Sequence, residues 1–253
     1  MANILDRYGI KEVADVTFYE IKDDGSKGAP VLYLDTLKVS TIEQTAEEAE
    51  ARGGKGNPPL IIWDYGKEIT VTLEDALFSA KSMAIMFGNG TVETTNTITK
   101  TVSFIGSTVP IDWTGPDGKK HTITSPSVYD GKGRTYNSSA TSESETEFSS
   151  LASDGRYFAT FEVGVVGDVI EISAASFPGT YYVTGDTYAR SETTGVDEFF
   201  QFVIQKAKVQ SENTITLEAE GDPSVFNMNL RVMRPADGKM MKLIKYDLTD
   251  AAG

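Results

Sequence analysis

The stretch Val13–Ile21, VADVTFYEI, carries the pattern that decides the fold. Apolar and polar side chains alternate along it, and a period of two is the signature of a β-strand with one face turned toward a core. The turn-forming run Lys22–Gly28 follows, and Val31–Val39 predicts a second strand. The residues expected to share one face of this second strand, which Asp35 interrupts, are Val31, Tyr33, Leu37 and Val39.

The same alternation recurs along the rest of the chain between short turns. It predicts a hairpin around Tyr65–Gly66, and a turn is predicted at Gly164–Gly167 between two later strands. The further predicted strands are 60–64, 68–72, 92–105, 158–165, 168–174, 180–188, 199–209, 213–220, 225–233 and 240–247. Short strands at such spacing are typical of a β-sandwich or a β-barrel.

One segment has helical periodicity instead. Thr72–Asp75 has the side-chain oxygens of a capping box, and Gly88–Gly90 follows with the residues that end helices. Between them an apolar stripe recurs at steps of three and four, formed by Leu73, Ala76, Leu77, Ala80, Ala84 and Phe87. The sequence therefore predicts an amphipathic helix over 73–87, lying on a sheet.

Two stretches depart from the regular pattern. Thr41–Gly56 is acidic and then glycine-rich, which predicts either a short exposed helix or an extended arm. Residues 106–156 are polar, and Ser138–Ser153 holds nine Ser or Thr in 16 positions. This run therefore has too few apolar side chains to form a core. We expect this region to be an inserted surface lobe, with one β-hairpin around Trp113–Tyr129. The expected architecture is a mainly β domain, 1–105 and 157–253, formed by a β-sandwich or a rolled, barrel-like sheet with one flanking helix.

Composition excludes several classes of site. The 253 residues include no cysteine and one histidine, so disulfides, zinc–thiolate sites, iron–sulfur clusters and multi-histidine metal sites are ruled out. The net charge of −14 repels phosphate backbones, which disfavours a protein that grips nucleic acid. No run reaches the ~20 apolar residues that cross a bilayer. The start MANILDRYGIKEVAD lacks the basic-then-apolar order of a secretory signal.

Catalytic motifs are weak. Gly53–Gly56 lacks the spacing of a phosphate-binding loop and is more simply a loop tip, and His121 has no nucleophile elbow to serve. No carboxylate pair stands out among 37 acidic residues. We therefore expect no enzyme, cofactor or metal. A two-carboxylate hydrolase stays open, as does a monomeric carbohydrate-binding module that uses Trp63 and Trp113, although Trp63 in an Ile-Ile-Trp strand is more often a core residue.

Adjacent aromatic residues indicate strands that are covered on both sides. Tyr181 and Tyr182 fall on opposite faces of one strand, whereas Phe200 and Phe202 share a face of the next. Such strands suit a sheet that packs on its own core and also on a neighbouring subunit. These four residues are candidate inter-subunit contacts.

Several blocks resemble tail-tube and related virion structural proteins of tailed bacteriophages. They are Glu48–Glu68 continuing into Thr72–Ser79, Phe199–Val209, Thr216–Phe226 and Lys239–Tyr246. Together with the stretches between them, the resemblance spans about two-thirds of the chain and leaves out 106–156. It carries no catalytic motif.

The resemblance implies a β-sandwich or rolled sheet with one helix, forming stacked six-fold rings whose inner strands enclose a channel for DNA. An acidic lining would keep the phosphates from sticking. The arm 41–56 would be an inter-ring loop, with Met1–Tyr8 and the C-terminal tail as further stacking contacts. Its contact residues would be Glu47, Glu48, Arg52, Gly53, Gly54, Lys55 and Gly56.

The resemblance also implies the setting of the protein. It would be assembled in the host cytoplasm and located in the virion, without contact to a membrane. Its partners would be its own copies and a sheath, baseplate or tail terminator protein, and DNA would pass without specific binding. The 106–156 lobe would decorate the outside, and its presence leaves a baseplate, hub or neck ring open.

Overall fold

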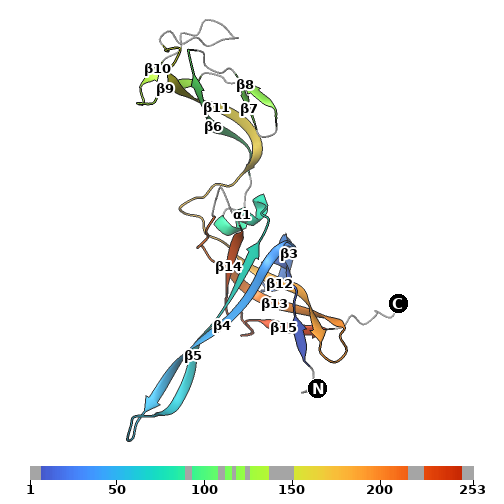
Figure 1. Ribbon diagram of the computed structural model, residues 1–253. Helices are drawn as coiled ribbons and strands as arrows, with labels where there is room; N and C mark the ends of the chain where they lie inside the picture. Colours follow the sequence, from blue (N-terminus) through green and yellow to red (C-terminus); the bar gives the residue numbers. More distant parts are fainter. Residues whose placement is uncertain are drawn as a thin grey trace, which may run out of the picture. The chain divides into compact units, whose positions relative to one another are not determined.

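The computed structural model describes residues 7–88, 93–107, 112–115, 118–122, 126–136, 151–215 and 225–246. It is mainly β, with 61% of the described residues in strands and 4% in one helix, which confirms the predicted class. The chain divides into two compact units, Met1–Val92 with Ile170–Gly253, and Glu93–Val169 (Figure 1).

The first unit is built on a nine-stranded antiparallel sheet in the order β3-β2-β12-β13-β14-β5-β4, with β1 paired to β12 and β15 to β13. The strands are β1 (Tyr8–Ile10), β2 (Asp15–Ile21), β3 (Lys27–Leu34), β4 (Leu37–Arg52), β5 (Pro59–Asp75), β12 (Thr180–Ser191), β13 (Asp197–Val209), β14 (Phe226–Val232) and β15 (Lys242–Tyr246). The two strands at the ends of this order, β3 and β4, are joined by only two residues, 35 and 36. The sheet must therefore curl back on itself, so it is rolled.

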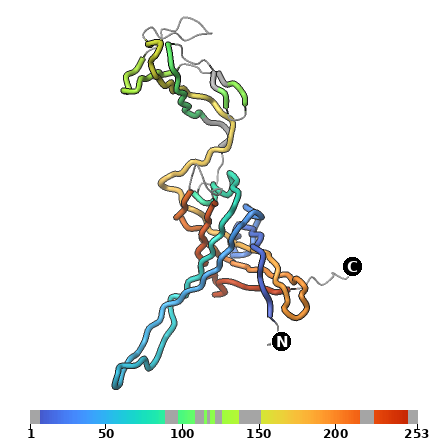
Figure 2. Tube along the Cα trace, in the orientation of Figure 1, coloured from blue at the N-terminus to red at the C-terminus, as the bar shows by residue number. Residues whose placement is uncertain are grey.

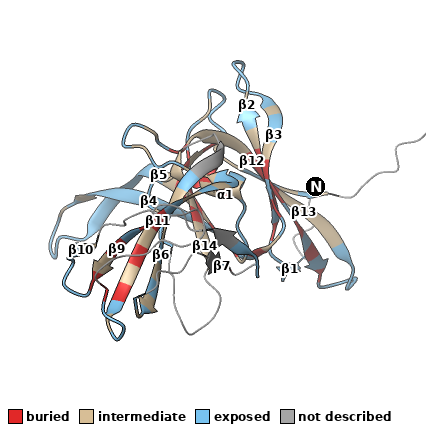
Figure 3. Cartoon of the chain, turned by 90° about the horizontal axis from the view of Figure 1, so that it is seen from above, coloured by how far each residue is buried: buried red, intermediate tan, exposed pale blue. Residues whose placement is uncertain are grey.

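Alternation along the strands fills this roll. In β2, Val16 and Phe18 are fully buried, and in β5, Val71 and Leu73 are fully buried, each pair separated by a less buried residue. Figure 3 shows buried segments, in red, along the strands. They join Ile204 and other apolar residues of β12, β13 and β14 in one core. The first predicted strand is thus confirmed as β2.

The predicted shared face of Val31–Val39 is wrong. Leu32 and Leu34 are buried in β3, whereas Tyr33 is exposed. A register irregularity at the start of β4 places Leu37 opposite Asp75 and Val39 opposite Glu74. Neighbouring residues Glu74 and Asp75 point to opposite faces, so the bulge turns Leu37 into the core and Val39 outward.

The helix is shorter than predicted. Helix α1 (Ala80–Phe87) begins after Ser79, whose hydroxyl accepts the N–H of Ser82 at 3.0 Å in a capping box. The predicted start at Thr72–Asp75 is wrong, because those residues continue β5. The predicted end is correct: Gly88 caps the helix with φ of 81°, and Asn213 donates to the Met86 carbonyl at 2.8 Å. Helix α1 buries Ile85 and Met86 against the sheet, while Leu77 of the predicted stripe is exposed.

The arm is an extended hairpin. Its strands β4 and β5 pair from Leu37 to Arg52, so the helical alternative for 41–56 is wrong. The turn predicted at Tyr65–Gly66 is also wrong: the irregularity there is a bulge between the pairs Thr45–Glu68 and Glu47–Tyr65, and β5 continues through it. Gly66 has a φ of 63°, which is the left-handed conformation. Glycine adopts this conformation in bulges as well as in turns.

The second unit contains a four-stranded antiparallel sheet and a separate two-stranded pair. The sheet has the order β10-β9-β11-β6, formed by β6 (Glu93–Ile105), β9 (Ser127–Asp130), β10 (Thr135–Tyr136) and β11 (Arg156–Val169). β7 (Asp112–Thr114) pairs with β8 (Lys120–Thr122), which falls within the predicted hairpin region. Val128, Leu151, Tyr157 and Ala159 form a small core of this unit.

One further turn prediction and two further strand predictions need correction or lie partly outside the described residues. The turn predicted at Gly164–Gly167 is wrong, because β11 continues through it to Val169 with a register shift. Residues 170–174 of the predicted strand 168–174 are not in a strand. Of the predicted strand 213–220, residues 213–215 are irregular, and 216–220 lie outside the described residues, as do 138–150 of the polar run.

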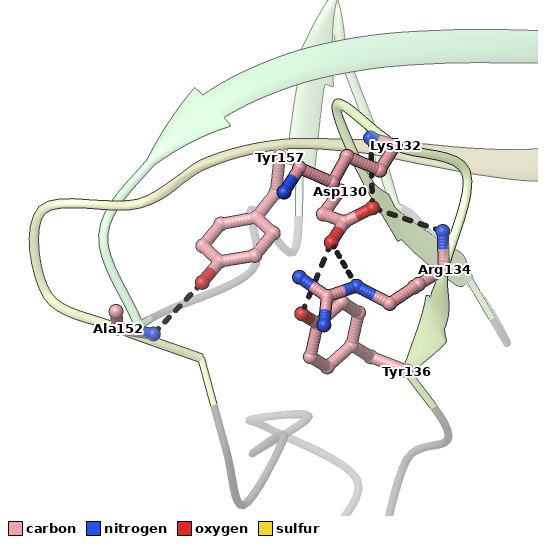
Figure 4. Close-up of polar contacts among 6 residues, drawn as sticks. All are labelled: Asp130, Lys132, Arg134, Tyr136, Ala152 and Tyr157. Atoms are coloured by element: carbon pink, nitrogen blue, oxygen red, sulfur yellow. Dashed lines mark hydrogen bonds and ion pairs between the residues drawn. The ribbon is translucent and has the colours of Figure 1, made fainter.

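A buried carboxylate organises the β9–β10 turn (Figure 4). Asp130 Oδ1 accepts the backbone N–H of Lys132 and of Arg134, each at 2.9 Å, and its Oδ2 accepts the Arg134 Nε–H at 2.7 Å. The backbone N–H of Arg134, the largest cause, and its guanidinium hold the pKa of Asp130 below its ordinary value. One side chain thus fixes the whole turn.

Candidate assembly surface

The β4–β5 hairpin runs beyond the other strands of its sheet as a two-stranded ribbon (Figures 1 and 2). Along it every residue of Thr41–Glu50 and of Gly54–Lys67 is exposed. Neither face of the ribbon is covered within the described part of the chain. Because an isolated two-stranded ribbon is at best marginally stable in water, this ribbon is suited to receive a partner.

The register of the ribbon separates its two faces. Residues directly opposite each other in an antiparallel pair lie on the same face, and faces alternate along each strand. Ala49 is opposite Trp63 and Ala51 is opposite Ile61, so one face is apolar. Trp63 is 53% exposed there, which corrects the expectation that it is a core residue. We call this the ribbon's apolar face, formed by Ala49, Ala51, Ile61, Trp63 and Tyr65.

The opposite face is acidic. Glu48 lies opposite Asp64, and Glu50 lies opposite Ile62 and forms an ion pair with Arg52. Glu47 stands opposite Tyr65, at the edge of the apolar face nearest the sheet. An apolar strip with one carboxylate, Glu47, at its edge favours an apolar partner that has a basic rim.

The glycines Gly53–Gly56 form the tip of the ribbon. Gly54 and Gly56 have φ of 83° and 86°, and the Asn57 N–H donates to the Gly54 carbonyl at 3.2 Å. A tight turn needs residues in the left-handed backbone conformation, and glycine adopts this conformation at no steric cost. Strand β5 rather than a helix follows, so this segment has none of the helix N–H groups that bind phosphate.

The aromatic candidates do not gather at the ribbon. Tyr181 packs edge-on against Phe18 at a centroid distance of 5.9 Å, and Tyr182 packs against Tyr19 at 6.2 Å. Burial raises the pKa of both tyrosines. Phe202 is 2% exposed and contributes to its own core.

Phe200 leads to a feature that sequence reasoning missed. It is half-buried beside a groove of about 340 Å³ at the base of the ribbon. The groove is lined by Ile10, Lys11, Glu12, Val13, Ala14, Lys38, Val39, Ser40, Ile42, Thr187, Phe200 and Phe202. These residues come from four separate stretches of chain. In the sequence, the only signal for the groove is the pair of apolar residues Val39 and Ile42 within one strand.

Other kinds of site find little support. Among the described residues, no group of three or more His, Cys, Asp or Glu side chains is placed to hold a metal ion. Within the same residues, no helix has the length and apolar character needed to cross a membrane. The space between α1 and the sheet is only about 10 Å³, about the size of one water molecule. The side chains of Trp113 and His121 lie outside the described ones.

Comparison with known proteins identifies the family of this chain. The model of the YomU/Tube protein family matches residues 8–245. The chain belongs to this family. A tail tube protein of Bacillus phage SPR is 26% identical to this tube-family chain over 189 residues, which cover 73% of the chain and 68% of that relative. The resemblance to phage tube proteins is thereby confirmed, and the tube-family chain is a structural component of a phage virion.

Proposed function

We propose that this chain assembles into stacked rings that form the tail tube of a bacteriophage and enclose a channel for DNA. The observation that carries the proposal is the fully exposed ribbon, with an apolar face on one side and carboxylates on the other. A monomer gains nothing from holding Ile61, Trp63 and Tyr65 in water, whereas a neighbouring copy would bury them.

Two sheet edges support lateral assembly. Strands β3 and β4 end the strand order, so within the described residues each has one edge without a backbone partner. Natural proteins cover or join such edges, because free ones aggregate. Joining edges between copies in a ring would satisfy these backbone groups and produce a continuous barrel.

The charge supports a channel for nucleic acid. A net charge of −14 would repel DNA phosphates from a lumen and keep the genome from binding to it. The proposed role is non-enzymatic. We infer that the chain assembles in the host cytoplasm. At its surface and ends the tube would contact a sheath, baseplate or terminator protein. The lobe 106–156 would decorate the outside of the tube.

The apolar face of the ribbon also weighs against a carbohydrate-binding module. Sugars are held by an aromatic ring together with hydrogen-bonding side chains. Beside Trp63 the same face presents Ala49, Ala51 and Ile61, which offer no side-chain donor or acceptor, and Tyr65 and Glu47 supply polar atoms on one side of the ring only.

Electron microscopy of the purified full-length chain tests the proposal. We expect rings or tubes of uniform diameter whose amount rises with protein concentration. Particles that stay monomeric at the highest attainable concentration would overturn it, as would specific binding by a monomer on a glycan array.

A further inference from the structure

The groove at the base of the ribbon is apolar with basic rims. Ile10, Val13, Val39 and Ile42 line it and are 38–55% exposed, so their apolar surface is open to a ligand. Lys11 and Lys38 border it, and within the described residues neither forms an ion pair with a carboxylate. Glu12 also borders the groove, which leaves its rim with a net positive charge.

We propose that this groove receives the apolar face of the ribbon from a second copy of the chain. The inference rests on the proposed function and adds to it the surface on which the ribbon docks. Trp63 and Ile61 would enter the apolar floor, and Glu47, which lies on the same face of the ribbon, would meet Lys11 and Lys38 at the rims. Both partners therefore match in polarity and in charge.

The ribbon cannot fill the groove of its own chain. Ile42 lines the groove, and the ten residues from there to Arg52 run in an extended strand away from it. At ~3.3 Å per residue the tip lies about 33 Å from the groove. Only another molecule can bring a ribbon into it.

The contact would also allow copies of the chain to be added one after another. Ribbon and groove are different surfaces of the same chain, so their contact is heterologous: each copy that donates a ribbon still has an empty groove. Such a contact repeats from one copy to the next and produces a ring or a stack rather than a closed dimer.

Charge reversal tests the pairing. We expect Lys11→Glu with Lys38→Glu, and separately Glu47→Lys, to raise the concentration needed for assembly roughly tenfold or more, since each places like charges where Glu47 meets the groove. A mixture of the two variants should assemble, because every ribbon then finds a groove of opposite charge. The control for the groove variant, Lys22→Glu with Lys81→Glu, makes the same change in net charge at exposed sites away from the groove.

Crosslinking provides a measurement that does not depend on those variants. The chain has no cysteine, so Ala49→Cys and Val39→Cys in one chain introduce the only two thiols. In assembled tubes a short bis-maleimide should join ribbon to groove and produce a ladder of multimers on a denaturing gel. Replacing Val39→Cys by Lys81→Cys should abolish the ladder.

The outcomes separate the two proposals. If the unmodified chain forms no rings or tubes, the proposed function fails. If it forms tubes but the charge variants assemble normally, the mixture shows no rescue, or the crosslinker produces no ladder, the groove is not the docking surface. Tubes that form only after another tail protein is added, with that protein crosslinked to Val39→Cys, would assign the groove to that protein and overturn the inference.

Discussion

Gly185 lies in β12 directly opposite Phe202 of β13, where a Cβ would stand 2.1 Å from Phe202 Cε1. Because Phe202 is 2% exposed, its ring has no free space into which it could retreat. We expect Gly185→Ala to lower the free energy of unfolding by about 1–3 kcal/mol through overpacking. Chemical denaturation measures this. Gly9→Ala, where nothing lies within 4 Å of the added Cβ, should change stability little, and equal stability of the two variants would contradict the packing described for Phe202.

Asp130 makes the stability of the β9–β10 turn depend on pH. Its folded-state pKa is lowered, chiefly by the backbone N–H of Arg134 and then by the Arg134 side chain. A carboxyl with a lowered pKa contributes stability that is fully present above its unfolded pKa of about 3.9 and is lost as the pH falls through the folded value. We expect Asp130→Asn to speed the hydrogen exchange of residues 127–136 near neutral pH. We also expect the protection of these residues to change less as the pH is lowered. Asp154→Asn, at an exposed position, is the control, and an unchanged pH profile for Asp130→Asn would contradict this role.

At the scale of single elements, the start of α1 makes a prediction. Ser79 and Ser82 satisfy each other's backbone N–H groups, the reciprocal bonds of a capping box. Ser79→Ala should therefore cost about 1 kcal/mol of stability, measured by thermal or chemical denaturation. Lys81→Ala, on the exposed side of the same helix, should cost much less. A large loss in Lys81→Ala and none in Ser79→Ala would place the start of the helix elsewhere.

Strands β2 and β5 show why the sequence predicts some features and not others. Alternation in Val13–Ile21 predicts β2 correctly, because one face of that strand meets the core and the other does not. Residues 69–75 satisfy both periods: Ile69, Val71 and Leu73 alternate, while Leu73, Ala76 and Leu77 also recur at helical steps. Pairing with β14, more than 150 residues away, decides for the strand.

Turns and surfaces show a different limit. Glycine serves a bulge at Gly66 and a hairpin turn at Gly54, and local sequence does not separate the two uses. The ribbon residues Glu47, Glu48 and Gly53–Gly56 are contiguous, so the resemblance could single them out. The groove joins Ile10, Lys38 and Phe200, which become neighbours only once β1, β4 and β13 are in place.

At the scale of the whole molecule, folding and assembly should be separable, because the outer ribbon contributes nothing to the buried core. Replacing residues 46–67 by a two-residue Asn-Gly turn would join Thr45 to Glu68, which are already opposite each other in the register. Every removed residue except Ala51 and Gly53 is exposed, so the melting temperature should change by no more than a few degrees. Assembly into tubes, followed by sedimentation and electron microscopy, should be lost.

A matched change at the other end of the sheet distinguishes loss of the ribbon from general damage. The β2–β3 turn, residues 22–26, is also exposed and contains Gly25 with a φ of 80°, so replacing it by Asn-Gly makes the same kind of turn at another exposed hairpin, with a smaller deletion. That variant should melt and assemble like the unmodified chain. If the shortened ribbon instead lowered the melting temperature strongly, the ribbon would have to pack within its own subunit. If the shortened chain still formed tubes, stacking would have to run through other surfaces, such as the free edges of β3 and β4. Only the combination of a retained melting temperature and lost tubes assigns the ribbon to contacts between copies.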